Sequence, residues 1–267
     1  MMTLPNPILM HGLGNRFAIL DLRGGGTLTD DGAKTLASQT GVDQVLTIEP
    51  GREADVYMGI WNADGSRVAA CGNGTRCVAW HVLAETGGSR LVLETDASVL
   101  MATVSGDHQV SVDMGVPKLD WPDIPLAERM DTRFVDIKIG PIDAPILMAP
   151  TAVNMGNPHV VFFVEDIDSI DIPGVGPLIE WHPLLPEGAN VGFATLQGPA
   201  DIRLRVWERG AGLTQACGTG ACAALVAAHR LRRLGREATV HLDGGDLHVT
   251  WRDDDHVIMT GPVAYET

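Results

Sequence analysis

The sequence predicts an α+β protein built from two similar domains that an approximate two-fold axis relates. A cysteine before a glycine-rich turn occurs twice, in AACGNGTRCVAW (69–80) and in QACGTGACAALV (215–226). A helix-like apolar run follows each turn, and three segments of alternating apolar and polar residues follow each run. Because repetition of a whole helix-and-strand series indicates a duplicated unit, each half of the chain is expected to fold as one domain.

The central helix of each half is bounded by glycines. We expect this helix at about Thr75–Glu85 in the first half, before Gly87, and at about Thr219–Leu234 in the second half, before Gly235. Glycine often follows the last helical residue because it readily adopts the left-handed conformation that ends a helix. Two further helices, both weakly amphipathic, are expected at Asp31–Ser38 and at Val175–Trp181.

The expected strands show period-two alternation, and Asp-Gly, Gly-Gly and Gly-Asp pairs separate several of them. These are hairpin signals, so we expect mainly antiparallel sheets with hairpin connections rather than parallel crossover units. The expected strands are 17–22, 44–50, 56–65, 91–96, 99–106 and 109–117 in the first half, and 133–140, 159–166, 203–210, 238–245, 247–254 and 256–263 in the second.

A proline-rich segment, 116–131, marks the crossing between the domains, because it contains Pro117, Pro122 and Pro125. The predicted domains are therefore residues 1–117, completed by 262–267, and residues 118–261. We expect the two cysteine turns to face each other across the cleft between these domains.

Composition and charge exclude several classes of protein. Hydrophobic residues make up 45% of the 267 residues and charged residues 20%, which is typical of a folded globular chain. The net charge of −15 would repel a phosphate backbone, so nucleic acid is not an expected partner. The densest basic run, His229–Arg236, falls in the expected last turns of a helix, where cations complement the helix dipole.

No targeting or membrane segment is predicted. The start of the chain, MMTLPNPILMHG, has no basic n-region and no long apolar h-region, and no run approaches the ~18 apolar residues of a membrane span. We therefore expect a cytoplasmic protein without a membrane partner. Its four cysteines do not suggest a disulfide scaffold, and a reducing compartment would keep them as thiols.

Cys71 and Cys217 are the candidate catalytic residues, because each stands at a predicted helix start. Unpaired amide N–H groups and the positive end of the helix dipole favour a bound anion there, and they also favour thiolate over thiol. The glycines after each cysteine let the backbone approach a ligand closely. Two opposed turns would hold one carboxylate and place a sulfur on each face of the neighbouring carbon. That arrangement suits inversion: one thiolate removes the α-proton and the opposite thiol delivers another.

The other cysteines and the lysines indicate neither a metal nor a cofactor. Cys77 and Cys222 lie inside the helices among apolar residues, which is typical of small core side chains, and the cysteine spacings match no zinc signature. Pyridoxal phosphate would need a Schiff-base lysine. The only lysines are Lys34, Lys118 and Lys138, and no phosphate cup accompanies any of them.

Several motifs, taken in order, resemble the diaminopimelate epimerase family over essentially the whole chain. The resemblance implies two halves, each with strands wrapped around a central helix. It also implies cofactor-free interconversion of LL- and meso-2,6-diaminopimelate by a thiolate and a thiol, in lysine and peptidoglycan precursor synthesis. The motifs are MHGLGNRF (10–17), GVDQVL (41–46), NADGSRVAACGNGTRC (62–77), MGNPH (155–159), GANVGF (188–193) and ERGAGLTQACGTGACAA (208–224).

The resemblance also implies roles for individual residues. Cys71 and Cys217 would be the acid–base pair, and Glu208 and His159 would tune protonation and bind ammonium groups. A substrate with two amino-acid heads needs an arginine fork for a carboxylate, an anion for an ammonium, and amides that serve either group. The implied substrate-binding residues are Asn15, Gln44, Asn62, Gly72, Asn73, Asn157, Asn190, Glu208, Arg209, Gly218 and Thr219.

The chain departs from the family pattern at three positions. Arg16 stands where the family usually has Asp, which would put a cation near the edge of the cleft and beside Asn15. Leu213 stands where Glu is frequent. Thr219 replaces the more usual Ser and keeps the hydroxyl, so no functional change is expected from it.

Other interpretations of the same residues stay open at this point. Asn62 could begin a hairpin turn, His159 could be a satisfied strand histidine, and Glu208 with Arg209 could be an exposed pair. The whole chain could be another cofactor-free racemase or isomerase on the same scaffold, acting on proline, hydroxyproline or an unsaturated acid. It could also be a thiol redox sensor. The expected partner is a small molecule, and a homodimer is an open expectation.

Overall fold

The computed structural model describes residues 4–266, which divide into two compact units. The first contains the chain up to Asp113 together with the segment from Thr260 onward, and the second contains Met114–Met259. The predicted boundaries lie a few residues further along the chain, after Pro117 and Gly261. The ends of the predicted domains, residues 1–3 and 267, lie outside the described residues. None of the helices in residues 4–266 is long and apolar enough to cross a membrane.

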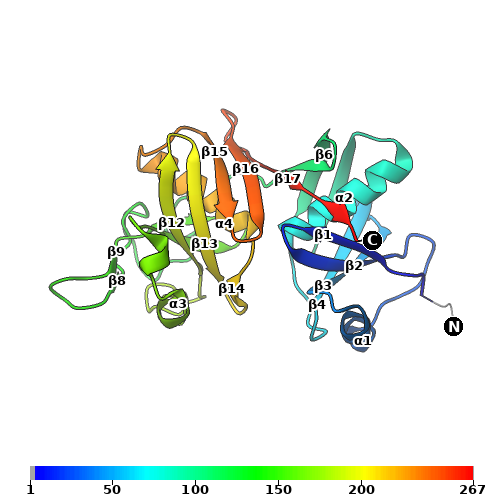
Figure 1. Ribbon diagram of the computed structural model, residues 1–267, viewed down its shortest axis with the longest axis horizontal. Helices are drawn as coiled ribbons and strands as arrows, with labels where there is room; N and C mark the ends of the chain where they lie inside the picture. Colours follow the sequence, from blue (N-terminus) through cyan, green and yellow to red (C-terminus); the bar gives the residue numbers. More distant parts are fainter. Residues whose placement is uncertain (1–3, 267) are drawn as a thin grey trace. The chain divides into compact units, whose positions relative to one another are not determined.

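The strands of the first unit pair as a mixed sheet with two helices, coloured blue to cyan-green in Figure 1 except for the red C-terminal segment. Thr29 caps its first helix by accepting a hydrogen bond from Gly32 N. The elements in chain order are β1 (Ile8–Gly12), β2 (Asn15–Asp21), α1 (Asp30–Thr40), β3 (Gln44–Pro50), β4 (Val56–Asn62), α2 (Gly72–Thr86), β5 (Arg90–Glu94), β6 (Val99–Gly106) and β7 (Gln109–Asp113), and the short strand β18 (Ala264–Tyr265) pairs with β1.

The second unit repeats this series after a small two-stranded sheet. That small sheet contains β8 (Lys138–Ile139) and β9 (Leu147–Met148). The elements that follow are β10 (Thr151–Asn154), β11 (Pro158–Phe163), η1 (Ile167–Ser169), α3 (Ile172–Glu180), β12 (Asn190–Gly198), β13 (Asp201–Glu208), β14 (Gly212–Thr214), α4 (Gly218–Arg230), β15 (Glu237–Leu242), β16 (Gly245–Trp251) and β17 (Val257–Pro262).

Strand pairing confirms the duplication. In unit 1 the pairs β1–β2, β3–β4 and β5–β6 are antiparallel, and β2–β3 and β4–β5 are parallel. In unit 2 the corresponding antiparallel pairs are β10–β11, β12–β13 and β15–β16, and the parallel pairs are β11–β12 and β13–β15. The strands of the two units therefore share one topology.

The expectation of hairpins rather than parallel crossovers is wrong at four places. Each parallel pair is joined by a crossover that contains one of the four α-helices. Only a long connection can return a strand to a parallel neighbour. Period-two alternation reports that one face of a strand is buried, and it carries no information on the direction of the neighbouring strand.

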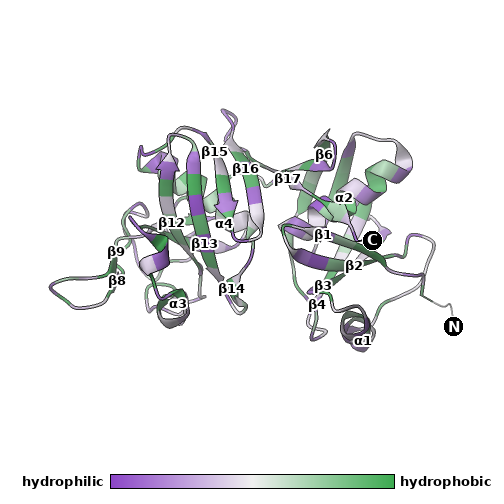
Figure 2. Ribbon diagram, in the orientation of Figure 1, coloured by the Kyte–Doolittle hydropathy of each residue, from purple (hydrophilic) through white to green (hydrophobic). Residues whose placement is uncertain are grey.

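The second helix of each unit is the one that the strands surround. α2 packs against β1, β5, β6 and β7, and α4 packs against β10, β11, β13 and β16. Ten of the thirteen residues of α4 are buried, which places this helix inside the core rather than on it. The strands bury alternate residues, as the hydropathy bands along β13 show in Figure 2. The predicted sheet around a central helix is confirmed.

The structure explains two differences from the predicted strands, one at β8 and one at β12. The expected strand at 133–140 reduces to β8, because upstream of it Val135 N donates to Pro150 O and Ile137 N donates to Val135 O instead of forming a ladder. The strands β1, β9, β10, β12, β14 and β18 were not expected, and β12 shows why a strand can be missed. Asn190–Ala194, the first five residues of β12, are all buried, so this stretch shows no alternation.

Candidate active site

The first cysteine turn places the Cys71 sulfur on the opening turn of α2. Cys71 is the N-cap residue, with φ −149° and ψ 107°, and its Sγ accepts a hydrogen bond from Gly74 N at 3.3 Å. Its carbonyl accepts from both N and Oγ1 of Thr75, each at 2.9 Å. The helix thus starts three residues earlier than about Thr75, and the cysteine occupies the position where a side chain meets the free N–H groups.

The second cysteine turn repeats this backbone. Cys217 is the N-cap residue of α4, with φ −122° and ψ 106°, and it is 4% exposed. Thr219 Oγ1 lies 3.6 Å from its Sγ. Both cysteines therefore take the same capping conformation, although their side-chain partners differ.

The second glycine of each turn is required by packing. A Cβ on Gly74 would lie 2.9 Å from Leu46 Cδ1 and 3.4 Å from the Cys71 sulfur. A Cβ on Gly220 would lie 2.9 Å from Val206 Cγ2 and 3.2 Å from the Cys217 sulfur. A Cβ at either position would therefore force a shift of the facing Leu46 or Val206 side chain, of the cysteine sulfur, or of the helical turn itself.

Cys217 is held as a thiol. Burial raises the pKa of this thiol, and the charge of Glu208 raises it further, while contacts with Thr219 and the Gly220 N–H oppose the shift. The pKa of Glu208 is itself raised by burial, and Thr214 Oγ1 donates to its Oε1 at 2.5 Å. A carboxylate only accepts, so Cys217 donates its proton in the hydrogen bond between the two side chains.

The remaining cysteines are core residues, as the sequence predicts. Cys77 and Cys222 are both 0% exposed. Burial raises the pKa of Cys77 to about 12, so it stays protonated near neutral pH. A buried thiol of this kind packs as a small apolar side chain.

Three amide side chains of unit 1 gather at one edge of its sheet. Asn15 begins β2, Gln44 begins β3 and Asn62 ends β4. Register places Gln44 beside both Phe17 and Asn62, and Gln44 Nε2 donates to Asn62 Oδ1 at 3.0 Å. Asn15 Oδ1 and Gln44 Oε1 are buried and accept no hydrogen bond from the described residues. Two acceptors at this edge thus lack a protein donor.

The start of α2 lies at the same edge. Gly12 pairs with Asn15, and a Cβ on Gly12 would lie 3.6 Å from Asn73 O. Asn73 is 4% exposed, and its Oδ1 accepts a hydrogen bond from the buried Arg76 Nη2 at 2.8 Å. Unit 1 therefore brings together the predicted residues Asn15, Gln44, Asn62, Cys71, Gly72 and Asn73.

Arg16 does not join this group. Its guanidinium forms an ion pair with Glu266, at 2.7 Å for Nε to Oε1, and donates to Gly41 O at 2.7 Å. Successive side chains of a strand point to opposite faces, so Arg16 lies on the other face of β2 from Asn15. The expected cation beside Asn15 is replaced by an ion pair with the C-terminal segment.

Unit 2 places different residues at the equivalent register positions. His159 pairs with Asn190, and Glu208 lies one step beyond the Val191–Trp207 pair. His159, Asn190 and Glu208 thus correspond to Phe17, Gln44 and Asn62 of unit 1, and Asn157 corresponds to Asn15. At these positions unit 2 therefore carries a histidine and a carboxylate where unit 1 carries a phenylalanine and an amide.

His159 is a neutral acceptor. It is 1% exposed, and burial, with a contribution from Arg209, lowers its pKa to about 3. Its Nε2 lies 3.0 Å from Asn157 Oδ1, which only accepts, so Nε2 carries the proton. Its Nδ1 is buried and has no partner among the described residues, so it presents a lone pair suited to a donor such as an ammonium group.

Both the oxygen and the nitrogen of the Asn190 side-chain amide form hydrogen bonds within unit 2. Its Oδ1 accepts from Arg209 N at 3.0 Å, and its Nδ2 donates to Pro158 O at 3.0 Å. The exposed Arg209 also donates from Nη1 to Glu187 O at 2.7 Å. Unit 2 therefore brings together the predicted residues Asn157, His159, Asn190, Glu208, Arg209, Cys217, Gly218 and Thr219.

Three contributing residues were not anticipated from the sequence. Arg76 binds Asn73, Thr214 binds Glu208, and Glu180 binds the segment around Arg209. Each acts through a partner that only the folded register reveals, so no local motif marks it.

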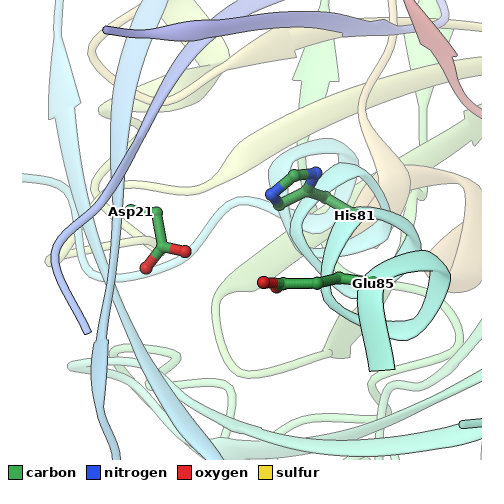
Figure 3. A group of neighbouring side chains, drawn as sticks. All are labelled: Asp21, His81 and Glu85. Atoms are coloured by element: carbon green, nitrogen blue, oxygen red, sulfur yellow. The ribbon is translucent and has the colours of Figure 1, made fainter. Parts of the chain in front are cut away.

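In Figure 3, Asp21 at the end of β2 faces His81 and Glu85 of α2. The potential metal-ligand atoms of these three side chains lie within 4.8 Å of one another. Arg23 Nη2 donates to Asp21 Oδ2 at 2.5 Å and also to Glu85. The guanidinium already supplies a cation to both carboxylates, so the cluster is an ion-pair network of unit 1.

Comparison with protein families places this geometry in context. Residues 8–119 and 151–266 match the family described as diaminopimelate epimerase. The chain belongs to the diaminopimelate epimerase family. It is 50% identical over 264 residues to the diaminopimelate epimerase of Brucella anthropi, covering 96% of this chain and 88% of the relative. It is 51% identical over 261 residues to that of Phenylobacterium zucineum, covering 96% and 94%.

Solved structures share the epimerase fold at low identity. A PhzF-family phenazine biosynthesis protein from Bacillus anthracis superposes with a TM-score of 0.68 at 16% identity, covering 100% of this chain and 98% of that one. A hydroxyproline epimerase from Agrobacterium vitis superposes with a TM-score of 0.66 at 16% identity, covering 98% and 90%. These likenesses establish the fold and not the substrate.

Proposed function

We propose that this protein interconverts LL- and meso-2,6-diaminopimelate, with Cys71 and Cys217 as the acid–base pair. The observation that carries the proposal is the pair of matched N-cap cysteines at the starts of α2 and α4. They stand in a chain that is half identical to named diaminopimelate epimerases over nearly its whole length.

The proposed reaction is a proton exchange at one carbon. A thiolate takes the α-proton, so the C–H bond breaks and an S–H bond forms. The electron pair passes into the carboxylate, which backbone N–H groups at the helix starts stabilise. The opposite thiol then donates its proton to the other face, so the carbon is inverted and the thiolate and thiol have exchanged places.

The surroundings of the two cysteines differ. Cys217 is buried and hydrogen-bonded to Glu208, which favours the thiol. We infer that a turnover that begins with Cys217 as the thiol uses Cys217 as the acid and Cys71 as the base, and that the reverse turnover uses them in the opposite roles.

Recognition of a substrate with two amino-acid heads draws on the other residues. Buried acceptors suit ammonium groups, and these are Asn15 Oδ1, Gln44 Oε1 and His159 Nδ1. Arg209 suits a carboxylate because its guanidinium presents paired donors. Asn190 stays a predicted substrate-binding residue, and its Oδ1 also accepts from Arg209 N.

We place this reaction in lysine and peptidoglycan precursor synthesis, in the cytoplasm and without a cofactor. The partner is then the small-molecule substrate. A homodimer, and the exclusion of nucleic acid and membrane, stay predictions from the sequence.

A chiral assay of the purified protein tests the function. LL-diaminopimelate, L-proline and trans-4-hydroxy-L-proline are incubated separately under reducing conditions in deuterated water. We expect inversion of diaminopimelate alone, with solvent deuterium at the α-carbon of the product. Inversion of an imino acid instead would assign the protein to that branch of the fold, and no inversion of any substrate would favour the thiol sensor.

A further inference from the structure

Glu180, the last residue of α3, is a buried carboxylate in an unfavourable place. It is 5% exposed and stands at the negative end of a helix whose last turn has no basic residue. Among the residues that the structure describes, no lysine, arginine or histidine forms an ion pair with it. Burying a carboxylate without a cation is costly, so its hydrogen bonds must account for its presence.

The two carboxylate oxygens bind the two sides of the Glu208–Arg209 pair. Trp207 Nε1 donates to Oε2 at 2.8 Å, and Gly210 N donates to Oε1 at 2.8 Å. These donors belong to the residues immediately before and after the pair. One side chain therefore fixes both ends of the segment that carries Glu208 and Arg209.

The main chain of Glu180 also binds the residue that precedes β12. Its carbonyl accepts from Ala189 N at 3.0 Å, and Ala189 precedes Asn190, whose Oδ1 accepts from Arg209 N. The helix also abuts Trp207, because a Cβ on Gly176 would lie 2.5 Å from the indole Cδ2. The end of α3 is thus packed against both strands that lead to the site of unit 2.

The segment needs such a restraint because of its own composition. Gly210 and Gly212 have φ values of +76° and +81°, a conformation that glycine enters easily and leaves easily. Between them, Ala211 N donates to Glu208 O at 3.0 Å. With Gly210 N bound to Glu180, the turn that follows Glu208 has one defined geometry.

We propose that Glu180 is a positioning residue, which holds the Glu208–Arg209 turn so that Glu208 contacts Cys217 and Arg209 faces the substrate. The inference rests on the proposed function for the roles of Glu208 and Arg209. An indole N–H and a backbone N–H only donate, and here each donates to a different oxygen of Glu180. A carboxylate provides two, whereas a glutamine amide provides one and opposes a donor with its NH₂ group.

The test compares Glu180→Gln with Glu165→Gln, which removes an exposed carboxylate of the same unit. We expect Glu180→Gln to lower kcat/KM roughly 10- to 100-fold, the effect of losing a hydrogen bond to a charged group. Part of the loss should fall on kcat through Glu208 and part on KM through Arg209. The control variant should keep wild-type values.

A pH profile separates positioning from general destabilisation. Glu208 raises the pKa of Cys217, and Cys217 must be protonated to act as the acid. Displacing Glu208 lowers that pKa, so the alkaline limb of kcat/KM should move to lower pH in Glu180→Gln for the isomer whose inversion uses Cys217 as the acid. A variant that only loses stability would retain the wild-type limb in its folded fraction.

Amide spectra of ¹⁵N-labelled protein give a readout independent of activity. The Trp207 indole and Gly210 amide signals should shift in Glu180→Gln and stay in place in Glu165→Gln. If wild type inverts diaminopimelate but Glu180→Gln matches the control in kinetics and in these signals, the inference is wrong and the function stands. If wild type shows no inversion, the function fails, and unshifted signals would overturn the inference as well.

Trp207→Phe keeps the test decisive should Glu180→Gln not fold. It removes one donor and leaves the Gly210 contact, so a smaller loss of kcat/KM and a smaller shift of the alkaline limb are expected. An unchanged limb in folded Trp207→Phe would contradict the inference. Where both single variants fold, their effects on kcat/KM should not add in the double variant. Phenylalanine at position 207 removes the indole N–H that the NH₂ group of a glutamine at position 180 would oppose.

Discussion

One register position distinguishes the chemistry of the two halves. Asn62 in unit 1 and Glu208 in unit 2 occupy equivalent positions at the ends of β4 and β13. Glu208 raises the pKa of Cys217, whereas unit 1 carries the neutral Asn62 at the equivalent position. A two-base inversion needs one thiolate and one thiol at the same time, because two thiols have no base and two thiolates have no acid.

Substitution of either N-cap cysteine tests these roles. We expect Cys71→Ala and Cys217→Ala each to lower kcat by at least about 10²- to 10⁴-fold, the usual contribution of a general acid or base. Cys77→Ala should retain turnover, because this thiol is buried and stays protonated. The chiral assay measures all three, and wild-type turnover in Cys217→Ala would refute the assignment.

The strands β3 and β13 pack closely against the two cysteine turns, at Gly74 and at Gly220. Substitution of a glycine by alanine tests this packing. A Cβ on Gly74 would lie 2.9 Å from Leu46. We expect Gly74→Ala to destabilise the protein by about 1–3 kcal/mol, as overpacking does, and to lower kcat by moving the sulfur. The matched control is Gly235→Ala, whose Cβ would meet nothing within 4 Å. Urea unfolding of both variants gives the comparison, and equal midpoints would contradict the packing argument.

The ion pairs of one histidine between strands should make part of the free energy of unfolding depend on pH. His241 Nδ1 of β15 lies 2.8 Å from Asp246 Oδ1 of β16, and its Nε2 lies 3.2 Å from Asp201 Oδ1 of β13. Both carboxylates raise the pKa of His241, and Asp246 contributes more than Asp201. A raised pKa means that the stabilisation is present below the unfolded value near 6.5 and is lost as pH rises through the folded value. The midpoint difference between wild type and His241→Gln in urea should therefore be larger at pH 6 than at pH 9. A difference that is constant with pH would show that the ion pairs contribute nothing.

At the scale of the whole molecule, repetition and alternation predicted the duplicated fold, its four helices and most of its strands. They could not predict strand direction, which depends on where a crossover helix returns the chain. They also missed β12, because burial on both faces removes the alternation. The site was predicted in part, because Cys71 and Cys217 carry a local motif. Glu180, Arg76 and Thr214 carry none, since each acts on a partner brought close only by folding.

Oxidation tests whether Cys71 and Cys217 act on the same substrate carbon. If Cys71 and Cys217 act on opposite faces of one carbon, only the substrate separates their sulfurs, so an oxidant should join them when the substrate is absent. A disulfide requires the two Cα atoms to approach within roughly 7 Å, so the link reports that the two turns come together. We expect diamide to inactivate the protein with formation of an intramolecular disulfide between the Cys71 and Cys217 peptides, and dithiothreitol to restore activity. Peptide mapping identifies the link, with Cys77→Ala and Cys222→Ala as controls that should form it equally well. Reversible inactivation through separate modification of each thiol, with no linked peptide, would mean that the two cysteines do not share a substrate.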